Sequence, residues 1–159
     1  MGSILVAYFS ATGTTARVAH EIADALSADT FEIAPAQPYT SADLNWTDRS
    51  SRSSVEMDDE SCRPAISGAV KDMAQYDTVF VGFPVWWYVE PRIIDTFLES
   101  YDFAGKRIVP FATSGGSGLG KAPQRMQQIA SGAAVEAGRL LNGRQSAASI
   151  RAWAQDMGI

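Results

Sequence analysis

The spacing of apolar residues changes repeatedly along the chain, and this alternation constrains the fold more than any other feature. An unbroken apolar run at 4–9 is typical of a strand buried on both faces, whereas Val18, Ile22 and Leu26 then recur every four residues, as on one face of a helix. Five such strand–helix units predict an α/β fold, a doubly wound parallel sheet with helices on both faces. The further strands are expected at 30–34, 78–83, 107–113 and 133–137, and the further helices at 66–73, 91–98, 122–130 and 150–157.

The length of 159 residues suits a single domain spanning 1–159. Two segments of this domain fit the alternating strand–helix pattern poorly. The long loop at 35–63 has no sustained periodicity. It is either a solvated connection or a flap over the ligand-binding edge of the sheet, anchored by Leu44 and Trp46. Pro110 lies inside the strand at 107–113 and has no N–H to donate, so we expect a bulge or an unpaired position there.

Composition excludes several classes of function. A net charge of -5 argues against a nucleic-acid partner, which requires a basic face. The single cysteine, Cys62, and the single histidine, His20, exclude an internal disulfide, a cysteine zinc cluster and a histidine-rich metal site. No apolar stretch is long enough to span a membrane and the first residues do not resemble a secretion signal, so the expected location is the cytoplasm, with no membrane partner.

The loop after the first strand combines four hydroxyl side chains with a glycine at the start of a helix. A helix N-terminus presents unpaired N–H groups, which suits a phosphate. The alternative is simple helix capping, which needs only one hydroxyl. The nucleoside-triphosphate and dinucleotide glycine motifs are absent, and the loop has no cysteine nucleophile. The candidate phosphate-binding residues are Ser10, Ala11, Thr12, Gly13, Thr14 and Thr15.

The loop after the strand at 78–83 carries three consecutive aromatic residues, which offer a stacking surface for a flat ring. Adjacent residues rarely face the same core, so we expect Trp86 or Trp87 to point into the site. Between Pro84 and Pro91 the loop has no glycine, and bulky residues resist positive φ, so we expect no positive φ there. The candidate ring-binding residues are Pro84, Val85, Trp86, Trp87 and Tyr88.

The loop after the strand at 107–113 is rich in glycine, so its backbone can approach the hydrogen-bonding edge of a heterocycle. A flexible linker is the alternative, but the loop joins a strand to a helix inside the domain. The candidate residues are Thr113, Ser114, Gly115, Gly116 and Gly118.

The three loops, in this order on this fold, resemble those of flavodoxins and small flavodoxin-like proteins. The resemblance implies bound FMN, strand order 2-1-3-4-5 and electron transfer in which no side chain is catalytic. The electrons would pass to a redox partner protein or a small-molecule acceptor. The modest negative charge and the long loop at 35–63 differ from simple flavodoxins. They keep open an FMN-dependent NAD(P)H:quinone-type reductase and a binding module that has lost the flavin. The sequence does not indicate the oligomeric state.

Overall fold

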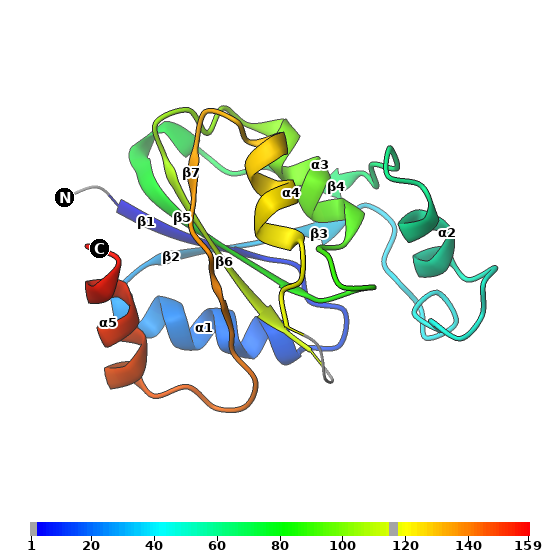
Figure 1. Ribbon diagram of the computed structural model, residues 1–159, viewed down its shortest axis with the longest axis horizontal. Coiled ribbons are helices and arrows are strands. Elements are labelled where there is room, and N and C mark those ends of the chain that lie inside the picture. Colours follow the sequence, from blue (N-terminus) through cyan, green and yellow to red (C-terminus); the bar gives the residue numbers. More distant parts are fainter. Residues whose placement is uncertain (1–2, 115–117) are drawn as a thin grey trace.

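A parallel β-sheet forms the centre of the protein in the computed structural model, which describes residues 3–114 and 118–159 (Figure 1). The strands of the sheet follow the order β2-β1-β5-β6-β7, so the predicted order 2-1-3-4-5 is confirmed. A short strand, β8, also pairs with β6. The bounds are β1 (Ser3–Tyr8), β2 (Asp29–Glu32), β5 (Tyr76–Pro84), β6 (Arg107–Thr113), β7 (Ala134–Val135) and β8 (Arg139–Leu140).

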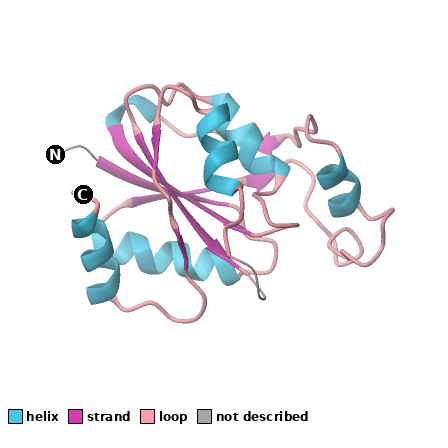
Figure 2. Cartoon of the chain, in the orientation of Figure 1, coloured by secondary structure: helices cyan, strands magenta, loops and turns pink. Residues whose placement is uncertain are grey.

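Helices cover both faces of the sheet, as the doubly wound fold requires (Figure 2). One face packs against α1 (Thr14–Leu26) and α5 (Ala147–Asp156), which bury Val18, Ile22 and Trp153. The other face packs against α3 (Arg92–Ser100) and α4 (Ala122–Ile129), which bury Phe97 and Met126. The alternating apolar pattern therefore predicted the layers correctly. None of the helices in the described part of the chain is long and apolar enough to cross a membrane.

The helix predicted at 66–73 is wrong. Ile66–Ser67 instead forms β4, which pairs antiparallel with β3 (Ala34–Pro35), and Gly68 then turns the chain at a φ of +81°. A 3-10 turn, η1 (Met73–Gln75), follows. Ile66, Val70 and Met73 pack against the same core, which explains their spacing, but they reach it from β4, from the segment after Gly68 and from η1 rather than from one helix. The predicted strand at 30–34 is likewise divided between β2 and β3.

The long loop at 35–63 contains a helix that the sequence did not predict, α2 (Arg52–Asp58). Its buried residues are Ser53, Ser54 and Glu56, so the apolar periodicity that identifies a helix is missing. This segment extends away from the sheet at the right of Figure 1. The prediction that Trp46 anchors it is wrong, because Trp46 is 72% exposed, whereas Leu44 is half-buried.

Pro110 divides the edge of the sheet. Its pairing with Val81 of β5 is in continuous register, so no bulge forms on that side. On the other side β7 pairs only at 107–108 and β8 only at 111–112. Gly138 lies between these two strands, so close that a Cβ there would be 2.4 Å from the Pro110 carbonyl oxygen. The unpaired position predicted at Pro110 is confirmed. The strand predicted at 133–137 is present as the shorter β7, and β8 beyond it was not predicted.

Candidate functional site

The three loops predicted to form the site follow β1, β5 and β6, and they meet at the carboxyl edge of the sheet. The hydroxyls of Thr15 and Thr113 lie 2.9 Å apart and join the first loop to the third. The Val85 N–H donates to the Thr113 carbonyl at 3.0 Å and joins the second loop to the third. The Trp86 ring lies edge-on to Phe9 with centroids 5.6 Å apart, at the base of the first loop.

The first loop presents an uncapped helix N-terminus. Gly13, at a φ of +96°, occupies the N-cap position of α1, and no described side chain caps the helix. The Ser10 hydroxyl instead accepts from the Gly13 N–H at 3.0 Å, and Thr12 and Thr14 are exposed. Simple capping therefore does not explain the four hydroxyls. The exposed loop and the first-turn N–H groups, which have no partner among the described residues, suit an oxyanion such as phosphate.

Two residues near this loop have other partners. Thr15 is buried, and its hydroxyl is engaged by Thr113. Arg17 forms an ion pair with Glu21 at 2.9 Å and donates to the Gly143 carbonyl at 3.0 Å. The groups left open to an anion are backbone N–H groups and small hydroxyls.

The second loop contains a tight two-residue turn. The Trp86 N–H donates to the Val89 carbonyl at 3.0 Å, and the Val89 N–H donates back to the Trp86 carbonyl at 3.2 Å. Between them Trp87 has a φ of +49° and Tyr88 a φ of +65°. Our expectation that this loop has no positive φ is wrong, because a two-residue hairpin of this kind requires the left-handed conformation at both central positions.

Contacts with the third loop hold this turn in place. The Lys121 N–H donates to the Tyr88 carbonyl at 3.2 Å. Gly120 lies so close that a Cβ there would be 2.1 Å from the same oxygen. The left-handed conformation costs an ordinary residue about 1–2 kcal/mol. The turn is therefore a strained feature that the surrounding structure maintains, as often occurs at functional sites.

The two tryptophans of this turn point in different directions. Trp86 is half-buried against Phe9 and Tyr39, whereas Trp87 is 44% and Tyr88 69% exposed. Pro84 ends β5 in register with Thr113. The turn therefore presents two adjacent aromatic side chains at the carboxyl edge of the sheet.

The third loop is held at its start by a residue that the sequence did not reveal. The Ser114 N–H donates to Asn142 Oδ1 at 3.0 Å, and Asn142 Nδ2 donates to the Ser114 carbonyl at 2.9 Å. Gly118 has open space where a Cβ would lie. Gly115 and Gly116 lie outside the described residues. Asn142 closely follows the last edge strand, and only the folded sheet places it beside Ser114.

The long loop at 35–63 reaches the site through Tyr39. The Tyr39 ring packs against Phe9 and Trp86, each with centroids 5.6 Å apart. The Arg52 guanidinium lies 3.8 Å from the centre of the ring, and the Tyr39 hydroxyl donates to Glu56 Oε1. Burial and this hydrogen bond raise the pKa of Tyr39 well above its usual range. The segment is therefore tied to the aromatic turn, and its role in binding a ligand stays a prediction.

A cluster of buried charges lies beneath the aromatic turn. The carboxyls of Glu90 and Asp95 are fully buried, and Arg125 contacts both, with Nε 3.0 Å from Glu90 Oε1 and Nη2 3.4 Å from Asp95 Oδ2. Burial and the nearby Asp95 raise the pKa of Glu90 to about 8, although Arg125 opposes the shift. Burial also raises the pKa of Asp95. These residues are scattered along the sequence, so no motif predicted the cluster.

Arg92 connects this cluster to the long loop. Its guanidinium donates to the carbonyls of Met57 at 2.8 Å, Asp59 at 3.2 Å and Glu56 at 3.3 Å. These carbonyls lie at the C-terminal end of α2, where a cation is favoured. Arg92 therefore fixes α2 against the start of α3.

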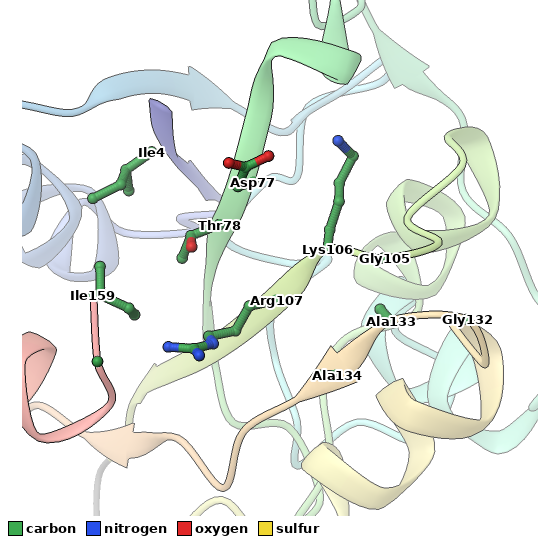
Figure 3. A pocket seen from close by; sticks show the side chains of 11 residues that line it. Ile4, Asp77, Thr78, Gly105, Lys106, Arg107, Gly132, Ala133, Ala134 and Ile159 are labelled. Carbon is green, nitrogen blue, oxygen red and sulfur yellow. The ribbon is translucent and has the colours of Figure 1, made fainter. Parts of the chain in front are cut away.

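Two cavities differ in their position relative to the loops. One of about 570 Å³ lies near the amino ends of the strands, and Ile4, Thr78, Lys106 and Arg107 are among its lining residues (Figure 3). Lys106 there already donates to the Tyr76 carbonyl at 2.6 Å. The other, of about 470 Å³, lies beside the aromatic turn and α4. No described cluster of three or more His, Cys, Asp or Glu side chains is arranged to hold a metal ion.

Known proteins of the same fold resemble this chain. A family model described as flavodoxin matches residues 3–157. A flavoprotein structure from Bacteroides eggerthii is 50% identical over 100% of this chain and 99% of its own, with a TM-score of 0.95. One from Bacteroides uniformis is 51% identical over 97% and 98%, with a TM-score of 0.91. A flavoprotein from Lactobacillus acidophilus, solved in complex with FMN, shares the fold at 21% identity over 97% and 99%, with a TM-score of 0.73. No curated protein matches the chain.

Proposed function

Because the chain belongs to the flavodoxin family, we propose that it binds FMN at the carboxyl edge of its sheet and carries electrons through the bound flavin. The observation that carries this proposal is the uncapped N-terminus of α1, which opens beside the exposed aromatic turn. The N-terminus of α1 is suited to the FMN phosphate, and the aromatic turn is suited to the flat ring of FMN. The similar fold of the Lactobacillus flavoprotein, which was solved with FMN, supports the same assignment.

On this proposal the flavin supplies the redox chemistry, and the chain supplies binding and orientation. Backbone N–H groups and the hydroxyls of Thr12 and Thr14 hold the phosphate. Trp87 and Tyr88 would pack against the ring, and Asn142 holds the start of the third loop through the N–H and the carbonyl of Ser114. The electrons pass to a redox partner protein or a small-molecule acceptor, and the cytoplasmic location stays a prediction.

Replacing Thr12 and Thr14 together with alanine should weaken FMN much more than riboflavin. Only FMN carries the phosphate, and two hydrogen bonds to a charged group contribute about 3 kcal/mol in total, which corresponds to about a 100-fold loss of FMN affinity. Titrating both flavins and following the quenching of flavin fluorescence measures the difference. Thr47→Ala, which removes another exposed threonine hydroxyl, is the matched control. Equal losses for FMN and riboflavin would remove the phosphate site from this loop.

A second candidate function is an FMN-dependent NAD(P)H:quinone-type reductase. The cavity of about 470 Å³ beside Trp87 favours it, because a carrier of electrons between proteins needs no second small-molecule site. Mixing the FMN-loaded protein with NADH or NADPH and a quinone separates the two candidates. Steady oxidation of the nicotinamide supports the reductase, and its absence leaves the carrier.

A further inference from the structure

Three aromatic rings meet where the long loop at 35–63 contacts the candidate flavin site. The centroid of the Tyr39 ring lies 5.6 Å from those of Phe9 and Trp86, and the latter two centroids are also 5.6 Å apart. Phe9 directly precedes the first loop, and Trp86 directly precedes the exposed Trp87. Tyr39 therefore contacts the base of two of the loops that are assigned to FMN.

The two neighbours of Tyr39 differ in how firmly their own backbone holds them. Phe9 continues β1, because its N–H donates to the Gly82 carbonyl at 2.9 Å, and its side chain is 1% exposed. Trp86 is half-buried and begins the two-residue turn, whose central residues have the strained left-handed conformation. Loss of the Tyr39 ring would therefore disturb the aromatic turn more than the first loop.

Two residues of α2 fix the position of Tyr39. The Arg52 guanidinium lies over the ring, 3.8 Å from its centroid, and the Tyr39 hydroxyl donates to Glu56 Oε1. Arg52 Nε donates to Glu56 Oε2 at 2.9 Å, and Arg52 Nη1 donates to the Gln37 carbonyl at 2.6 Å. Glu56 is buried, so both of its carboxylate oxygens have partners away from solvent. A cation over a ring and a hydrogen bond to a buried carboxylate are both stronger where water is excluded.

Attachment of α2 to the core does not by itself explain this arrangement. Arg92 donates to three carbonyls at the C-terminal end of α2, and the Ser53 N–H donates to the Asp43 carbonyl at 2.9 Å. These bonds hold the helix without any contribution from Tyr39. The contact that Tyr39 adds is the one with the aromatic turn.

We propose that Tyr39 is a positioning residue for the flavin: held by Arg52 and Glu56, it fixes Trp86 and with it the turn that packs against the flavin ring. The inference deepens the proposed function and rests on it for the identity of the ligand. A turn that is already fixed does not have to be ordered when the ring binds. The long loop thereby contributes to flavin affinity through the turn.

Replacing Tyr39 with leucine should weaken FMN and riboflavin by the same factor, about tenfold, because binding must then order the turn and its side chains. The two flavins share the ring, and the first loop keeps its own contacts with the phosphate. At saturating FMN the residual flavin fluorescence should rise, because neighbouring aromatic side chains quench a loosely held ring less. Tyr39→Phe keeps the ring contacts and should restore both the affinity and the quenching.

Tyr101→Leu is the matched control. Tyr101 is also half-buried, and its ring packs against Phe97 and Phe103 with centroids 5.3 and 6.2 Å apart. Its hydroxyl accepts from the Val70 N–H at 2.8 Å, so it also ties an irregular segment to the core, but it belongs to none of the three loops. Tyr101→Leu should lower stability and leave flavin affinity and quenching unchanged. A merely structural role of Tyr39 predicts the same outcome for both variants.

A double-mutant cycle shows whether Tyr39 acts through Trp86. In a Trp86→Leu background, Tyr39→Leu should change flavin affinity less than about twofold, because the side chain that Tyr39 positions is already absent. Additive losses of affinity in the two single variants and the double variant would overturn the proposal.

Failure of this proposal is distinguishable from failure of the proposed function. If the wild type binds FMN but Tyr39→Leu changes affinity and quenching no more than Tyr101→Leu, the positioning role is wrong and the flavin assignment stands. If the wild type does not bind FMN, the NMR signals of the four tryptophan indole N–H groups test the positioning of the turn in the FMN-free chain. Tyr39→Leu should shift the signals of Trp86 and Trp87 but not that of Trp153. Unshifted signals of Trp86 and Trp87 overturn the proposal.

Discussion

Replacing Arg125 with methionine is expected to lower the free energy of unfolding by about 3 kcal/mol, because it leaves two buried carboxyls without their shared cation. The Arg125 guanidinium lies 3.0 Å from Glu90 and 3.4 Å from Asp95, and both carboxyls are fully buried. Arg63 and Arg92 remain near Asp95 at 3.9 Å, so part of its charge stays compensated. Urea unfolding at fixed pH measures the change. Arg49→Met, at an exposed position, is the matched control and should change stability little.

The same cluster predicts how stability depends on pH. The pKa of Glu90 rises on folding from 4.5 to about 8. The folded protein therefore keeps a proton that the unfolded chain releases, and the stability contributed by Glu90 is complete below about pH 4.5 and lost as the pH rises through about 8. Glu90→Gln removes this titration. Its stability should therefore decline less than that of the wild type over this interval.

Two outcomes would contradict the assignment of Glu90 as a buried carboxyl that titrates beside Arg125. A loss of stability in Arg125→Met that does not grow with pH would mean that the carboxyls stay neutral without the arginine. If Glu90→Gln declines with pH as steeply as the wild type, the titrating group is not Glu90. Asp95→Asn then provides the next comparison, because burial also raises the pKa of Asp95.

The double substitution Trp87→Asn and Tyr88→Gly in the turn should raise the stability of the protein and lower its affinity for FMN. The two left-handed aromatic residues cost about 2–4 kcal/mol in total, whereas asparagine and glycine adopt this conformation readily. Glycine loses more conformational entropy on folding than the tyrosine it replaces, and this loss cancels about 1 kcal/mol of the stability gained. The FMN-free protein should therefore gain about 1–3 kcal/mol in its free energy of unfolding. Loss of both ring contacts should weaken FMN about 100-fold.

Thermal unfolding of the FMN-free protein and fluorescence titration with FMN measure the two effects. Trp46→Asn removes a more exposed tryptophan that lies outside the turn, and it should change neither quantity appreciably. A double variant that loses stability would show that the aromatic side chains support the fold more than the backbone strain opposes it. An unchanged FMN affinity would separate the turn from the flavin.

The sequence predicted the parts of the protein whose signals are local. The helices on both faces and the positions of the three loops follow from apolar runs and from the residues that end them, whereas the strand order was implied only by the resemblance to flavodoxins. The first loop was recognisable because its hydroxyls lie next to one another at a strand–helix junction. The unpaired position at Pro110 was predictable for the same reason, since a proline lacks an N–H in any fold.

The parts that the sequence did not reveal depend on contacts between distant residues. The helix α2 buries serines and a glutamate rather than an apolar face. Tyr39 contacts the aromatic turn while Arg52 and Glu56 of α2 contact its ring and its hydroxyl. The positive φ values of Trp87 and Tyr88 belong to a two-residue turn against which Gly120 and Lys121 pack from another loop. No property of the aromatic residues themselves predicts that conformation.

The interruption opposite Pro110 also bears on how the protein avoids self-association. An exposed sheet edge with a long run of free N–H and C=O groups is a template on which another chain can add a strand. Here the outer strands β7 and β8 contain two residues each, separated by a turn at Gly138 that crosses the proline. The edge therefore offers an incoming strand no continuous ladder. A single imino acid inside β6 thus lies opposite the break that deprives this edge of the continuous ladder on which edge-to-edge aggregation depends.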